Sequence, residues 1–199
     1  MKYGKLSPCL DRLLIIASGP SAGGLVFPDV LPVMAVNGAI DGLKRADYWF
    51  TLDPSQGNRA RMEKPKQGTT YLCAAGPQQA LNVKGSQIIF LRRLPGRGIS
   101  EKPDSVMTGN SAFGALQVAV LLGAKKIGLV GVDATKDEYW HGPGRSKSLE
   151  QLPAMMSCAL PQLMRKGIEV RLGSVYDKPR VTCFRAMSPP DLVEWLCAK

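Results

Sequence analysis

The sequence predicts an α/β fold with an open, mainly parallel sheet and helices on both faces, and two observations support this. Short apolar runs resemble buried strands, and most of them lack the apolar–polar alternation of a half-exposed strand. Helical patterns lie between some of these runs, as in right-handed strand–helix–strand crossovers. No internal repeat or long linker divides the 199 residues. We therefore expect one domain over residues 1–199.

The strands are expected at seven places along the chain: 13–17, 32–37, 47–52, 69–73, 87–91, 126–131 and 168–172. The segment 92–107 contains three arginines, two glycines and two prolines, and we predict that it is a loop.

Three helices are expected. The clearest covers 110–123, because a cluster of capping residues opens it at 108–111 and Gly123 closes it. A second covers about 148–166, where a stripe of leucines and methionines is interpreted as core and Pro161 should kink or break the helix. The third begins at Pro189 and runs to about residue 197.

Composition narrows the classes of protein. Lys and Arg outnumber Asp and Glu by 26 to 16, and the resulting charge of +10 favours either an anionic partner, such as a phosphate-bearing ligand or nucleic acid, or a solvated basic surface. The five cysteines lack paired spacing, so we expect reduced thiols. A single histidine excludes a multi-histidine metal centre. No apolar run reaches the ~18 residues of a membrane span, and we expect a cytoplasmic protein.

Ligands of open parallel sheets bind at the carboxyl ends of the strands, so the loops at those ends are the candidate site. The first loop is the turn 18–24, SGPSAGG, which reads either as a phosphate seat or as an ordinary tight turn. Others contribute Asn37, Asp53, the helix start at 108–111 and the segment 133–147. We expect peptide N–H groups near Pro20 and near Asn110 to converge on a bound anion. Arg92, Arg93 and Arg97 are candidates to clamp its phosphates.

His141 is the candidate general base, because imidazole is the side chain whose ordinary pKa suits proton transfer near neutral pH. The alternative is an exposed loop imidazole beside Trp140. Asp133 comes at the end of the strand 126–132, shortly after Gly131. It is either a contact to a metal ion or a ribose, or a cap or turn residue.

The strand followed by Gly19-Pro20-Ser21, the strand ending in Asn37, the segment DYWFTLDP and the segment TGNSAFGALQVAVLLGAKKIGLVGVD resemble one group of Rossmann-like proteins. This group includes CMP-sialic-acid-dependent sialyltransferases and 6-hydroxymethylpterin diphosphokinase-like proteins. The resemblance covers about residues 13–172.

The resemblance implies a nucleotide-sugar-dependent glycosyltransferase in which His141 is the general base and Tyr139, or less directly Tyr176, stabilises the departing phosphate. It implies that the nucleotide lies against two turns and the strand end between them: Ser18, Gly19, Pro20, Ser21, Asn37, Thr108, Gly109, Asn110 and Ser111, with Asp133 nearby.

Two alternatives remain. A diphosphokinase-like phosphotransferase would hold Mg²⁺ on Asp53, Asp133 and Asp137. A non-catalytic module would bind a nucleotide or nucleic acid through the basic surface. The donor, the sugar and the acceptor are not specified by these residues, and no metal ligand set is assigned.

Overall fold

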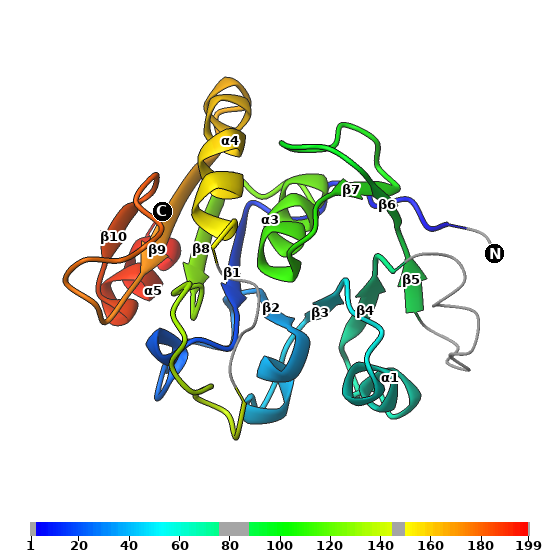
Figure 1. The fold of residues 1–199 in the computed structure, drawn as a ribbon, viewed down its shortest axis with the longest axis horizontal. Coiled ribbons are helices and arrows are strands. Elements are labelled where there is room, and N and C mark those ends of the chain that lie inside the picture. Colours follow the sequence, from blue (N-terminus) through cyan, green and yellow to red (C-terminus); the bar gives the residue numbers. More distant parts are fainter. Residues whose placement is uncertain (1–2, 76–87, 145–149, 199) are drawn as a thin grey trace.

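The computed structural model describes residues 3–75, 88–144 and 150–198. The described chain forms an eight-stranded sheet in which every pairing is parallel, in the order β10-β9-β8-β1-β2-β3-β4-β5 (Figure 1). Its strands are β1 Arg12–Ile16, β2 Val33–Val36, β3 Tyr48–Thr51, β4 Thr70–Cys73, β5 Ile88–Phe90, β8 Lys126–Val130, β9 Glu169–Gly173 and β10 Arg185–Met187. All seven expected strands are confirmed, and β10 is added at one edge.

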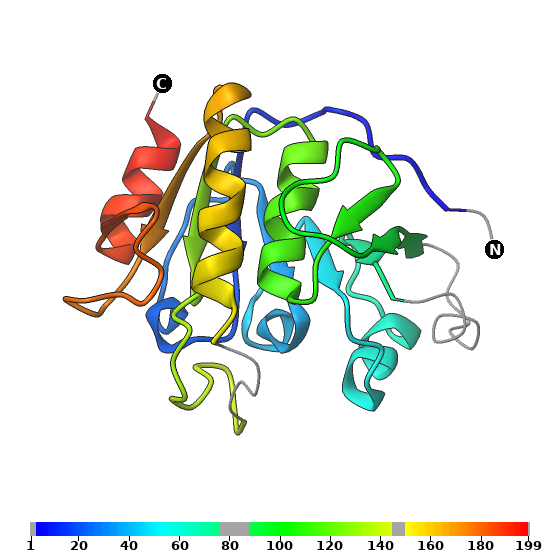
Figure 2. The ribbon, with the colours of Figure 1, turned by 45° about the horizontal axis from the view of Figure 1, so that its top comes forward.

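Burial on both faces explains why the strands read as continuous apolar runs. In β1, Leu13 and Ile15 pack into one core cluster, while Leu14 and Ile16 pack into the other. Helices α3 (Ser111–Leu121) and α4 (Leu152–Arg165) cover the first face side by side (Figure 2). Helices α5 (Pro189–Cys197) and α1 (Gln56–Glu63), with the 3₁₀ helix η2 (Asn37–Gly42), contribute to the second.

Helix α3 follows from the capping cluster and is confirmed. The side chain of Asn110 accepts hydrogen bonds from the backbone N–H groups of Ala112 and Phe113, which otherwise have no partner at a helix start. Gly123 takes a positive φ of 91° just beyond the helix, a conformation that favours glycine. The helix is thus held with its N-terminus at the carboxyl ends of the strands.

The prediction of a loop over 92–107 is wrong in part, because this segment contains two short strands. Strands β6 (Arg92–Leu94) and β7 (Ser105–Met107) pair in parallel as a separate two-stranded sheet. The buried side chain of Gln117 on α3 explains why: it donates to the carbonyl of Met107 and accepts from the N–H groups of Met107 and Ser100. The hydrogen bonds from α3 therefore hold the segment 92–107 in a regular structure, although its composition is typical of a loop.

Helix α4 shows that Pro161 does not break the helix, which continues to Arg165. The expected start at 148–149 lies outside the described residues. Helix α1 was not anticipated, because its sequence QGNRARME is polar and lacks an apolar stripe. The short 3₁₀ helix η1 (Pro20–Ala22) forms the turn after β1. No helix in the described part of the chain has the length and apolar character needed to cross a membrane.

Candidate functional site

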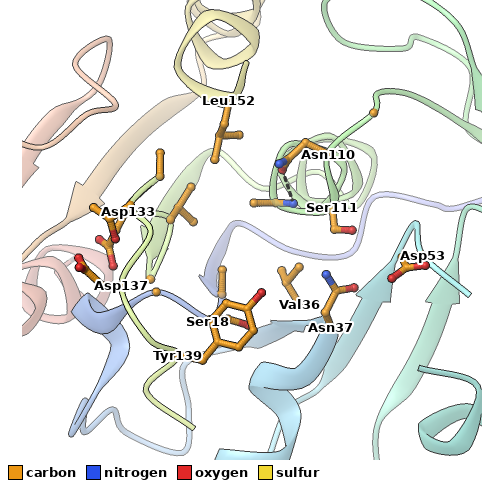
Figure 3. A pocket seen from close by; sticks show the side chains of 18 residues that line it. Ser18, Val36, Asn37, Asp53, Asn110, Ser111, Asp133, Asp137, Tyr139 and Leu152 are labelled. Atoms are coloured by element: carbon orange, nitrogen blue, oxygen red, sulfur yellow. Dashed lines mark hydrogen bonds between the residues drawn. The ribbon is translucent and has the colours of Figure 1, made fainter. Parts of the chain in front are cut away.

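A cavity of about 450 Å³ opens at the carboxyl ends of β1, β2 and β8 and at the N-terminus of α3 (Figure 3). It lies where the sheet order reverses, because β2 follows β1 on one side while β8 lies on its other side. Open α/β sheets bind ligands at such switch points. Its described lining residues are Ala17, Ser18, Gly19, Val36, Asn37, Asp53, Gly109, Asn110, Ser111, Ala112, Gly131, Val132, Asp133, Ala134, Thr135, Asp137, Tyr139 and Leu152.

The fold brings most of the candidate residues to this one place. Eight of them line the cavity: Ser18, Gly19, Asn37, Gly109, Asn110, Ser111, Asp133 and Tyr139. Four others lie beside it without being among its described lining residues: Pro20, Ser21, Thr108 and His141. The turn after β1 and the start of α3 therefore face the same space although about 90 residues separate them.

Two backbone N–H groups of the turn after β1 donate hydrogen bonds to other parts of the protein. The N–H of Gly19 donates to the carbonyl of Gly131 at 2.8 Å, and the N–H of Ser21 donates to Oδ2 of Asp133 at 2.9 Å. These two amides are therefore occupied and do not converge on a ligand, contrary to our expectation. The contacts instead hold the turn against the end of β8, which shapes the wall of the cavity.

Asp133 is 3% exposed, and its Oδ1 has no hydrogen-bond partner in the described part of the chain. Burial raises the pKa of this carboxyl above its ordinary value, and the hydrogen bonds from Ser21 only partly oppose the rise. The nearby Asp137 raises it further. Asp133 thus accepts a hydrogen bond from the backbone of the β1 turn, as the cap or turn alternative predicts.

The start of α3 supplies the positive end of the cavity. Gly109, Asn110 and Ser111 line it, and the partial positive charge of an 11-residue helix points toward it. Arg93 lies at this end, because its Nε donates to the carbonyl of Thr108 at 2.9 Å. A Cβ placed on Gly109 would lie 3.7 Å from the Arg93 guanidinium. This end is where an anionic group is best stabilised.

Arg92 is engaged elsewhere, since it pairs with Asp104 at 3.2 Å and lies over the ring of Tyr3. Of the three candidate phosphate clamps, Arg93 is thus the one shown beside the helix start. The described lining carries three carboxylates, from Asp53, Asp133 and Asp137, but no described Lys, Arg or His. The described residues contain no group of three or more His, Cys, Asp or Glu side chains placed to hold a metal ion.

The loop after β8 is folded onto the end of β1 and onto η2. The indole Nε1 of Trp140 donates to the carbonyl of Ala17 at 2.9 Å, and its backbone N–H donates to the carbonyl of Ser18. Gly38 and Gly42 make this approach possible: a Cβ on Gly38 would lie 2.8 Å from the imidazole, and one on Gly42 would lie 2.6 Å from the indole. These contacts set the position of His141.

The His141 imidazole is half-buried and reaches the cavity through Ser18, because its Nε2 lies 3.0 Å from Ser18 Oγ. Burial lowers the pKa of His141 below its ordinary value, the Asp41 carboxylate opposes this, and Arg61 adds to it. The ring also stacks on Tyr139 with centroids 5.4 Å apart. A neutral imidazole next to a hydroxyl that lines the cavity can accept a proton.

The sequence did not indicate two buried polar residues that contact Asn37, namely Thr51 and Asn58. Thr51 ends an apolar strand, and Asn58 lies in a polar helix without periodic pattern, so neither stands out among similar residues. The one signal that could have identified Thr51 is its position as a polar residue at the carboxyl end of a parallel strand.

The fold and the site define an open, parallel α/β protein with a cavity at its topological switch point. No protein-family model and no curated protein matches the sequence. Among solved structures, the sialyltransferase CstII from Campylobacter jejuni, in complex with the substrate analogue CMP-3FNeuAc, has a similar fold. The TM-score is 0.50 at 12% identity, over 90% of this chain and 86% of that one. The Rossmann-like fold is thus confirmed, whereas no finding supports the diphosphokinase-like part of the resemblance.

Proposed function

We propose that this protein is a nucleotide-sugar-dependent glycosyltransferase whose donor binds in the cavity between the β1 turn and α3. The observation that carries the proposal is the convergence of Ser18, Asn37 and the α3 start on one cavity at the switch point of the sheet. The fold shared with a sialyltransferase that binds a CMP-sugar analogue supports it.

In this proposal the donor's phosphate lies at the N-terminus of α3, near Gly109 and Arg93. The backbone N–H groups and the partial positive charge at a helix N-terminus stabilise an anion, so this binding mode does not require a lysine in the lining or a metal ion. The acceptor hydroxyl attacks the anomeric carbon, the bond from that carbon to the phosphate oxygen breaks, and the nucleotide leaves with the bonding electron pair. In this proposal Tyr139 donates a hydrogen bond to the departing phosphate, and its position in the cavity lining supports this.

His141 takes the proton of the acceptor hydroxyl in this reaction. Ser18 stands between the cavity and the imidazole, so the proton passes through its hydroxyl: Ser18 gives its proton to Nε2 and receives the acceptor's proton. The lowered pKa keeps the imidazole neutral near pH 7 and ready for this step.

Titration with CMP, CDP, UDP and ATP tests the proposal, by calorimetry and by thermal unfolding. At 100 times its Kd, a nucleotide should raise the free energy of unfolding by about 2.7 kcal/mol. For a domain of this size that corresponds to a melting temperature higher by roughly 5–10 °C. Absence of binding by every nucleotide would refute the proposal.

A cavity-filling variant shows whether binding occurs here. Gly109→Leu adds bulk at a lining position where the nearest atoms to a Cβ lie at ordinary contact distances, so the fold should tolerate it. It should abolish nucleotide binding. Ala154→Leu adds a branched side chain at an exposed position of α4 that is not part of the described lining, and it should bind normally.

A further inference from the structure

A row of polar side chains leads from the protein surface to the cavity wall and ends at Asn37. We call it the polar chain, and its members are Arg61, Asn58, Thr51 and Asn37. Asn58 and Thr51 are 3% and 0% exposed, so their hydrogen bonds are shielded from water. Buried polar groups are expensive unless every donor meets an acceptor, and the direction of each bond is therefore well determined.

Arg61 sets the direction at the outer end, because a guanidinium has donors only. It is held by an ion pair with Asp41, and its Nη1 donates to Oδ1 of Asn58 at 2.9 Å. The oxygen of the Asn58 amide is therefore turned toward Arg61. Its Nδ2 must point the other way, where it lies 3.0 Å from Thr51 Oγ1 and 2.7 Å from the carbonyl of Asp53.

The hydrogen bonds that Thr51 accepts determine where its own hydroxyl proton points. Its hydroxyl oxygen accepts from Asn58 Nδ2 and from the backbone N–H of Asp53, each at 3.0 Å, which uses both lone pairs. Its single proton has two acceptors within reach, Oδ1 of Asn37 at 2.7 Å and the carbonyl of Asp53 at 3.0 Å. The Asp53 carbonyl already accepts from Asn58 Nδ2, so the shorter contact to Asn37 takes the proton. Asn58 Nδ2 approaches the same oxygen at 3.3 Å.

The Thr51 proton thus holds the oxygen of the Asn37 amide, and the amide nitrogen points into the cavity (Figure 3). The backbone supports this placement: Asn37 has a positive φ of 52°, and its carbonyl accepts from Trp49 Nε1 at 2.7 Å. We propose that the polar chain fixes Asn37 as a hydrogen-bond donor, so that the site selects nucleotides presenting an acceptor oxygen or ring nitrogen there. In this role Thr51 and Asn58 are positioning residues that do not touch the ligand, and the inference rests on the proposed function.

Removing the Thr51 hydroxyl from the polar chain should leave the side-chain amide of Asn37 less firmly oriented. Thr51→Val keeps the shape but removes the proton that holds Asn37 Oδ1, and we expect CMP to bind about five- to tenfold more weakly by calorimetry. Thr51→Ser restores the hydroxyl and should bind within about twofold of the wild type. The matched control is Thr69→Val, since Thr69 is also buried but donates to the carbonyl of Ala46 at the opposite ends of the strands. Its Kd for CMP should be unchanged.

A variant that reverses the donor–acceptor direction of the hydrogen bonds in the polar chain is a more specific test. Asn58→Asp has the same shape but no donor toward Thr51, so the Thr51 proton turns to the new carboxylate and the Asn37 amide flips to satisfy the Thr51 oxygen. CMP should then bind at least tenfold more weakly. The Asp53 carbonyl also loses its donor, so Tm should fall, and affinity is measured at a temperature where the variant is fully folded. Equal affinity of CMP for the wild type, Thr51→Val and Asn58→Asp would overturn the inference while leaving the proposed function intact.

A measurement without nucleotide separates the two proposals. In the wild type the oxygen of the Asn37 amide faces Thr51, so NMR should show a weaker nuclear Overhauser contact between the Asn37 side-chain amide protons and the Thr51 methyl group than in Asn58→Asp, where the amide is flipped. Asn37 resonances are identified by their loss in Asn37→Asp. An equally strong contact in the two proteins would overturn the inference. Failure of all nucleotides to bind would overturn the proposed function, and with it the nucleotide selection, whatever the orientation of the amide.

Discussion

At the scale of single residues, His141 is the group whose titration should appear in activity. Its pKa lies below the ordinary 6.5 because burial disfavours the charged ring. As a base it works when neutral, so turnover of a CMP-sugar should fall only as the pH drops below about 6.5 and through that lowered pKa.

His141→Ala should lower turnover by ~10²–10⁴ and remove this acidic limb from the pH–rate profile. Ser18→Ala should also slow the reaction, because Ser18 connects the cavity to Nε2, but it should keep the limb. A variant lacking the imidazole that retains the wild-type profile would show that another group is the base.

Asp133 should make stability depend on pH in the direction opposite to most carboxyl groups. Its folded-state pKa is raised, so the folded protein holds this proton more tightly than the unfolded chain does. The contribution to stability is full below pH ~4 and is lost as the pH rises through the folded-state pKa. Asp133→Asn should remove that part of the slope.

Urea unfolding between pH 4 and 8 measures this difference, at about 1.4 kcal/mol for each unit by which the pKa is raised. The amide oxygen of the variant can still accept from the Ser21 N–H, so the β1 turn should survive. Parallel stability profiles of the wild type and the variant would contradict a raised pKa.

At the scale of elements, the start of α3 both caps the helix and lines the cavity. Asn110→Ala leaves the N–H groups of Ala112 and Phe113 without their acceptor, and it should cost about 1 kcal/mol of unfolding free energy. Ser188→Ala removes the cap of α5, where the serine accepts from the N–H of Asp191, and it should cost a similar amount.

The two caps differ in what else they affect. Asn110 lines the cavity whereas Ser188 is not part of its described lining, so only Asn110→Ala should also weaken nucleotide binding. Urea unfolding and CMP calorimetry on both variants give this comparison. Equal loss of affinity in both would mean that binding responds to overall stability and not to the α3 start.

At the scale of the whole molecule, the charge of +10 and the cavity should respond differently to salt. The described cavity lining carries no basic side chain, so CMP binding depends mainly on short-range contacts and should change less than about threefold between 50 and 200 mM NaCl. Binding of nucleic acid to the basic surface would neutralise several phosphates and should weaken by ~10³ or more over that range.

Titrations of CMP and of a single-stranded oligonucleotide at both salt concentrations decide between the glycosyltransferase and the non-catalytic nucleic-acid-binding module. Strong, salt-sensitive oligonucleotide binding with no CMP binding would favour the module.

Local pattern was enough to predict seven of the eight strands of the main sheet and the helices α3, α4 and α5. Strands buried on both faces are apolar at most positions, and the capping cluster at 108–111 marks the start of α3, so these elements carry their own signal. The same reasoning placed polar loops at the strand ends, and eight of the candidate residues line the cavity. The sequence therefore predicted seven strands and the gathering of these candidate residues at the carboxyl ends of the strands.

Only the tertiary structure decided how those groups are used. The N–H groups of the β1 turn are taken by Gly131 and Asp133, more than 100 residues away in the chain, and Ser18 meets His141 across a similar separation. Thr51 and Asn58 gain a role because η2 and α1 meet over the end of β3. Hydrogen-bond partners are set by which segments the folded sheet brings together, and local residue patterns carry no information about such distant pairs.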